Sequence, residues 1–87
     1  EEFLRWLGAH PAVNTFVVAG DCTDICIQQF ALTLKCHFNR LDMPGRVIVP
    51  AGATATYDAP GHNAALCHVA ALNQLMLNGV EVVSAVV

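Results

Sequence analysis

The chain has 87 residues, of which 55% are hydrophobic and 13% are charged, and its formal net charge is −3. This length supports one small domain, and such a high apolar content is typical of a segment that is buried against more protein. The absence of a basic cluster argues against nucleic-acid binding through phosphate neutralisation. No apolar run has the length of a membrane span, so we expect no membrane partner.

The first half of the sequence predicts a helix, a strand and a second helix. Residues 2–9 have a narrow apolar helical face, and Pro11 ends this helix. The largely apolar residues 13–19 suit a parallel strand that is covered on both faces. Residues 24–38 predict an amphipathic helix, because apolar side chains recur at every third or fourth position and form one stripe. The members of this stripe are Ile27, Phe30, Ala31, Leu34 and Phe38.

The second half predicts the same alternation of strand and helix. After a turn at Pro44 and Gly45, residues 47–49 begin a strand, and residues 51–61 form an irregular loop. Residues 62–78 predict a long helix that stops at Gly79, and residues 80–87 predict a third strand. The order β-α-β-α-β indicates an α/β protein with parallel strands and right-handed crossovers. Both loops that follow the first two strands should therefore lie at the same end of the sheet.

The turn after the first strand carries the main chemical signal. An apolar run ends at Gly20, a short polar segment follows, and Cys26 opens the helix. If Asp24 is the N-cap, the free N–H groups and the dipole of the first turn favour a thiolate at Cys26. The alternative is a small buried hydrophobe, which is the commoner fate of cysteine. Spacing alone leaves a reactive and an inert Cys26 equally open.

The segment VVAGDCTDICI resembles the nucleophile segment of the isochorismatase-like cysteine hydrolases, a family that includes nicotinamidases. The family pattern is present as Gly20, Thr23, Asp24 and Cys26, and the later segment AGATATYDAPGHNAAL resembles the next loop and helix. The similarity covers about residues 14–84. It implies a three-layer α/β/α, Rossmann-like fold with a parallel sheet. Residues 1–87 would be the carboxyl-terminal portion of a single hydrolase domain, completed by an upstream segment.

The resemblance implies that Cys26 is the nucleophile of an amidohydrolase acting on a small amide through a thioester acyl-enzyme. The family's catalytic Asp and Lys are expected in the missing upstream segment, because Lys35 does not match the catalytic lysine. On this interpretation the 87 residues alone are inactive. The alternative is a non-catalytic binding or scaffold member of the same fold.

The resemblance also implies a cis peptide bond between Asp21 and Cys22. This bond would direct the backbone N–H groups of Cys22 and Cys26 to one oxyanion. The physics of a non-proline bond alone favours trans. Gly20, Thr23 and Asp24 are expected to have structural roles at this turn, with capping of the helix as the main one.

Tyr57 and Asp58 are candidates for a substrate pocket, since their loop should face the Cys26 turn. The alternative is a surface turn in which Asp58 lies near the start of the next helix. The histidines (His10, His37, His62 and His68) show no HExxH pattern or i, i+4 pair, so we expect no metal site in this chain. In nicotinamidases a zinc-like divalent metal lies near the site, and the resemblance implies ligands for it in the missing portion.

The four cysteines show no CxxC spacing, and we interpret them as reduced thiols in a cytoplasmic protein. Cys36 and Cys67 lie within predicted helices, where we expect core positions. A redox disulfide between Cys22 and Cys26 is a weak third interpretation, because their spacing is CxxxC. The expected partners are a small amide substrate, the upstream segment and further copies of the protein in a homo-oligomer.

Overall fold

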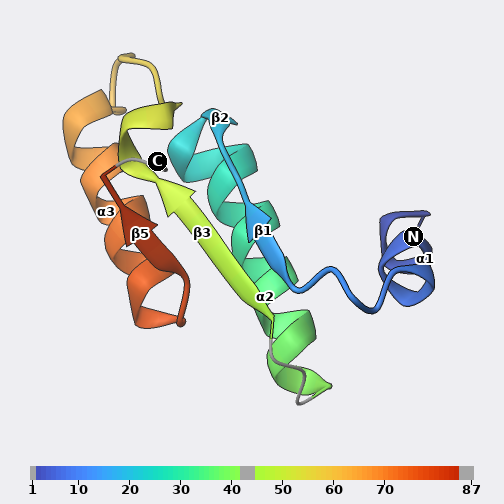
Figure 1. Ribbon diagram of the computed structural model, residues 1–87. Coiled ribbons are helices and arrows are strands. Elements are labelled where there is room, and N and C mark those ends of the chain that lie inside the picture. Colours follow the sequence, from blue (N-terminus) through green and yellow to red (C-terminus); the bar gives the residue numbers. More distant parts are fainter. Residues whose placement is uncertain (1, 42–44, 85–87) are drawn as a thin grey trace.

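The computed structural model describes residues 2–41 and 45–84 and shows a small parallel sheet with helices (Figure 1). Strands β1 (Thr15–Val17), β3 (Arg46–Pro50) and β5 (Glu81–Val83) pair in parallel in the order β1-β3-β5. The crossovers contain helices α2 (Gln28–Arg40) and α3 (Ala64–Leu77). The predicted β-α-β-α-β order and the parallel pairing are therefore confirmed.

Helix α1 (Glu2–Ala9) has the predicted bounds and lines a groove together with residues of α2. Its Phe3 ring contacts the rings of Phe16 in β1 and Phe30 in α2, with centroids 6.1 and 5.3 Å apart. Phe30 remains 42% exposed, although the sequence placed it in the apolar stripe of the second helix. The rest of that stripe is buried as predicted.

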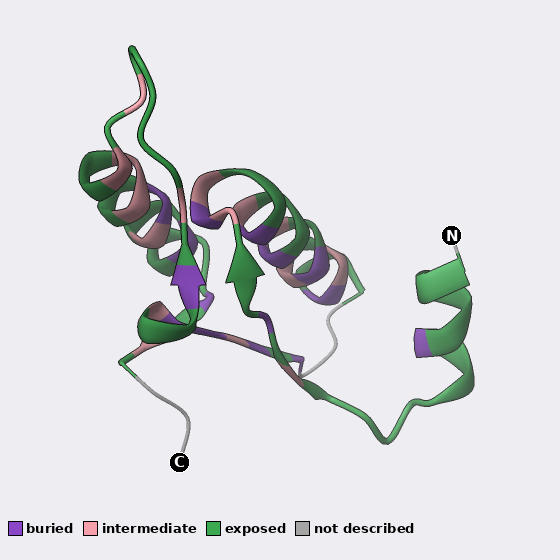
Figure 2. Ribbon diagram, turned by 90° about the horizontal axis from the view of Figure 1, so that it is seen from above, coloured by how far each residue is buried: buried purple, intermediate pink, exposed green. Residues whose placement is uncertain are grey.

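The core lies between one face of the sheet and the two helices α2 and α3 (Figures 1 and 2). Val47 and Val49 alternate along β3 toward this core and are fully buried, as is Leu75 of α3. The neighbouring Ile48 points to the opposite face, where Val17 beside it is 50% exposed. The described residues thus form two layers, the sheet and the α2–α3 layer.

Strand β1 is shorter than the predicted residues 13–19, whereas β3 extends beyond the predicted residues 47–49 at both ends. Residues 85–87 of the third predicted strand and Pro44 of the predicted turn lie outside the described residues. Gly79 has a φ of 91° directly after α3, which confirms the predicted C′ position. Within the described residues, no helix is long and apolar enough to cross a membrane.

The sheet continues at its carboxyl end as a second, two-stranded pairing. Strand β2 (Gly20–Asp21) pairs in parallel with β4 (Thr54–Ala55), after the 3₁₀ turn Ala51–Ala53. This pairing brings the turn after β2 and the loop after β4 side by side. The prediction that both loops lie at the same end of the sheet is confirmed, and this end holds the candidate site.

Candidate functional site

The turn that carries Cys26 begins with two backbone features. Gly20 has a φ of 124°, a conformation that glycine adopts far more readily than other residues. The bond between Asp21 and Cys22 is a non-proline cis peptide, the geometry that the resemblance implies. Cys22 then has an extended conformation at the N-cap position of the helical segment.

The segment Thr23–Ile27 is a π-helical turn that leads into α2. The Cys22 carbonyl accepts hydrogen bonds from the N–H groups of Ile25 and Ile27, both at 3.1 Å, and not from that of Cys26. The Cys26 side chain is exposed. Single π-helical turns occur frequently at functional sites. The turn therefore presents a thiol at the carboxyl end of the parallel sheet, where α/β proteins bind ligands.

Asp24 is not the N-cap, in contrast to the sequence-based expectation. Cys22, two residues earlier, has that position, because the helical segment begins at Thr23. The Asp24 side chain instead accepts a 2.6 Å hydrogen bond from His62 Nε2. Asp24 thus connects the turn to a loop that is 38 residues away.

His62 lies between two acceptors. Its Nε2 donates to Asp24 Oδ2, and its Nδ1 donates to the Tyr57 carbonyl at 2.7 Å. The Tyr57 carbonyl can only accept, and the pKa of the Asp24 carboxyl is lowered, so this arrangement favours a proton on both ring nitrogens of His62. The bond to Asp24 and then the bond to Tyr57 raise the pKa of His62 above its usual value.

The neighbouring Thr56 hydroxyl and then His62 lower the pKa of the Asp24 carboxyl. Thr56 Oγ1 and Asp24 Oδ1 are both shielded from solvent, and neither has a partner with full hydrogen-bond geometry within the described residues. The Thr56 hydroxyl therefore acts on Asp24 through proximity rather than a well-formed bond. One Asp24 oxygen is paired with His62, and the other is buried without a well-formed hydrogen bond.

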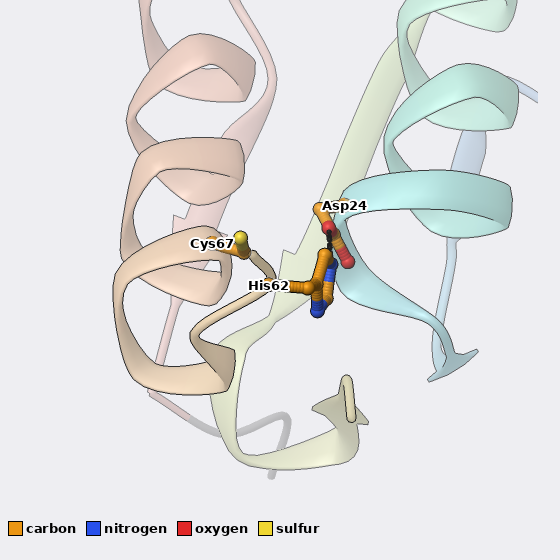
Figure 3. A group of neighbouring side chains, drawn as sticks. All are labelled: Asp24, His62 and Cys67. Atoms are coloured by element: carbon orange, nitrogen blue, oxygen red, sulfur yellow. Dashed lines mark hydrogen bonds and ion pairs between the residues drawn. The ribbon is translucent and has the colours of Figure 1, made fainter. Parts of the chain in front are cut away.

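The turn also contacts the start of α3. Thr23 is fully buried, and its hydroxyl hydrogen-bonds His68 Nδ1 at 2.8 Å. Cys67 is half-buried, and its Sγ lies within 4.8 Å of ligand atoms of both Asp24 and His62 (Figure 3). These three side chains include a carboxylate, an imidazole and a thiol, which are the zinc ligand types. The sequence did not lead us to predict this group of three side chains. Its only signal in the sequence was a histidine, His62, five positions before Cys67.

The two pocket candidates have different surroundings. Tyr57 is half-exposed, stacks on His62 with ring centroids 4.4 Å apart, and lines a pocket of about 280 Å³ with Asp21 and Cys22. Asp58 accepts a 2.8 Å hydrogen bond from the Ala64 N–H at the start of α3. Asp58 thus contacts the start of the next helix, as in the alternative interpretation. Cys26 is not among the residues that line this pocket.

Two expectations for the other cysteines are wrong. Cys36 is exposed, because it lies off the stripe of α2 that faces the sheet. Cys67 is half-buried beside polar groups rather than within the apolar core. Lys35, which was not assigned to catalysis, donates to the Gly45 carbonyl at 3.0 Å.

Comparisons with known proteins give no assignment. No protein-family model, no curated protein and no solved structure matches the chain. The site is therefore interpreted from its own geometry and from the residue pattern of the turn.

Proposed function

We propose that Cys26 is the nucleophile of a cysteine hydrolase that acts on small amides, with a nicotinamide-type amide as the leading substrate class. The observation that carries the proposal is the exposed Cys26 thiol on a π-helical turn that follows a cis peptide bond. The Cys26 N–H does not bond the Cys22 carbonyl, which supports a role as an oxyanion donor.

In the proposed reaction the Cys26 thiolate attacks the amide carbonyl, and the negative charge on its oxygen is stabilised by the N–H groups of Cys22 and Cys26. The carbon–nitrogen bond then breaks, the amine leaves with a proton, and a thioester to Cys26 remains. Water hydrolyses this thioester, which releases the acid and regenerates the thiol. The proposal takes the proton-transferring carboxylate and the assisting lysine from sequence outside these 87 residues.

Asp24 does not act as this base in the proposal. Its Oδ2 is bonded to His62, and its pKa is lowered, so it is a weak base. Asp24 and His62 instead hold the turn against the loop that carries Tyr57. The half-exposed Tyr57 ring, on the loop beside the turn, supports stacking on a flat substrate ring.

The fold part of the proposal is a three-layer α/β/α domain to which this chain contributes a portion. The open face of the sheet supports it, because Val17 and Ile48 form an apolar pair there with no helix over them among the described residues. An upstream segment with further strands and helices would cover this face.

The test is ammonia release from nicotinamide and other small primary amides by the protein that carries this chain. We expect Cys26→Ala to abolish the release and the exposed-site control Cys36→Ala to retain it. Ammonia release that persists in Cys26→Ala would contradict the proposal, as would a wild-type protein that hydrolyses none of these amides.

The second candidate is a non-catalytic scaffold or binding member that assembles as a homo-oligomer. The observation that favours it is the apolar surface of α3, where Leu66 is 69% exposed and Leu77 72% exposed. A monomer that hydrolyses amides would count against this candidate, and an inactive oligomer would count against the first.

A further inference from the structure

Three potential metal ligands meet where the Cys26 turn, the loop after β4 and the start of α3 come together (Figure 3). One ligand atom from each of Asp24, His62 and Cys67 lies within 4.8 Å of the other two. We propose that these residues form a binding site for a zinc-class divalent ion. The site is separate from the metal that the resemblance places upstream, and it does not depend on Cys26 being a nucleophile.

The chemical types of the three ligands determine which class of metal ion the site favours. A thiolate and an imidazole favour borderline-soft ions such as Zn²⁺, whereas Mg²⁺ and Ca²⁺ prefer ligand sets made of oxygen alone. Three protein ligands also leave a fourth tetrahedral position for water or another small ligand. The chemistry of the site is therefore that of a three-ligand zinc centre with one open position.

The orientation of His62 fits a metal ligand. Its Nδ1–H donates to the Tyr57 carbonyl at 2.7 Å, and this bond aims Nε2 at the Asp24 carboxylate. Metal-bound histidines usually have such a partner on the second nitrogen, which fixes the ring. In the proposed site the ion takes the place of the Nε2 proton. It also takes the place of the Cys67 thiol proton, and both protons pass to the solvent.

The Asp24 carboxylate provides a second observation. Its side chain is only 16% exposed, and its Oδ1 is buried with no hydrogen-bond partner among the described residues. A buried carboxylate oxygen without a well-formed hydrogen bond is costly, and the nearby Thr56 hydroxyl does not provide one. A cation beside Asp24 could coordinate Oδ1 or Oδ2, so that the carboxylate gains a charged partner in addition to His62.

The three ligand atoms must shift slightly from their positions in the structure to bind one ion. Ligand bonds of about 2.0–2.3 Å place tetrahedral ligand atoms roughly 3.3–3.6 Å apart. Asp24 Oδ2 and His62 Nε2 are 2.6 Å apart and must separate, whereas Cys67 Sγ, within 4.8 Å of both, must approach. The required shifts are on the order of 1 Å. Cys67 lies in the first turn of α3, which Asn63 caps through a hydrogen bond from the Leu66 N–H, so we assign the adjustment to the side chains.

The test adds Co²⁺, and then Zn²⁺, to the reduced and metal-free chain. Co²⁺ bound by a thiolate has a charge-transfer absorption, and its tetrahedral complexes have intense visible bands. We expect both signals to saturate at one Co²⁺ per chain and to disappear on addition of Zn²⁺. Wild-type protein without a thiolate band would overturn the proposal.

Substitutions of the proposed ligands test where the ion binds. Cys67→Ser should remove the charge-transfer band, whereas the control Cys36→Ser should keep it. His62→Gln should weaken Zn²⁺ binding by more than the roughly 10- to 100-fold that loss of an outer partner costs, and the control His37→Gln should not. Circular dichroism checks that each variant is folded. A band that persists in Cys67→Ser, or that is lost only in Cys26→Ser, would contradict the assigned site.

Discussion

The apolar core and the polar end of the sheet are stabilised in different ways. The core consists of side chains that recur with the period of a helix or a strand, such as Phe38 and Val47, and it is almost completely buried. The polar end consists of single contacts between distant residues, such as Asp24 with His62. Many apolar groups stabilise the core together, so the chain stays folded when a single polar contact elsewhere is lost. Each polar contact depends on only two residues and is lost when either one is replaced. We therefore expect core changes to unfold the chain and changes at the polar end to act locally.

The largest effect is expected for Phe38→Ala. Phe38 is 2% exposed, stacks with Phe16 at a centroid distance of 5.7 Å, and packs closely against Gly45. Removal of such a ring costs about 3–5 kcal/mol. This cost is comparable with the whole stability of a small domain, about 5–15 kcal/mol. Urea unfolding followed by circular dichroism should therefore show loss of the cooperative transition.

The matched control is Phe30→Ala, because the Phe30 ring is 42% exposed in the same helix. It should shift the midpoint of unfolding much less. Equal shifts for the two variants would show that the burial of the α2 stripe does not hold the fold together.

A smaller, local effect is expected when the Asp24–His62 pair is titrated in metal-free protein. The pKa of His62 is raised by Asp24. The stabilisation that protonated His62 contributes is therefore complete below about pH 6.5 and is lost as the pH rises through the raised pKa. The pKa of Asp24 is lowered by Thr56 and His62. The stabilisation that ionised Asp24 contributes is therefore present above about pH 3.9 and is lost as the pH falls through the lowered pKa.

Amide hydrogen exchange of residues 56–63 measures this effect. After correction for the intrinsic exchange rate, protection should be highest at pH values between the pKa of Asp24 and the pKa of His62, and it should fall on either side of this range. The core residues of β3 should show no matching change. In Asp24→Asn the alkaline loss of protection should move to lower pH. A loop whose protection is independent of pH would contradict the role of this pair.

The elements of the fold were predictable because their signals are local. Apolar spacing gave the positions of α1, α2 and α3 to within a few residues, and Gly79 marked the end of α3. The length of the first strand was overestimated, since its apolar run extends beyond the residues that pair in the sheet. Phe30 and Cys36 were misjudged, because exposure at the border of a helix stripe depends on which neighbours pack there.

The candidate site was predictable only in part. The Cys26 turn and its position at the carboxyl end of the sheet followed from the order of the elements and from the family resemblance. The cis bond at Asp21–Cys22 followed from the resemblance alone, because the physics of the bond favours trans. The pairs Asp24–His62 and Thr23–His68 join residues 38 and 45 positions apart, and no local pattern encodes such contacts.

The central claim is that the turn makes Cys26 reactive, and its most direct test compares two exposed thiols in one molecule. The folded chain is treated with iodoacetamide at neutral pH, and the alkylation rates of Cys26 and Cys36 are followed by peptide mapping. Both cysteines are exposed, so access alone predicts similar rates. We predict that Cys26 reacts faster by about tenfold or more, and that the rates converge in urea. Equal rates in the folded chain would contradict the claim.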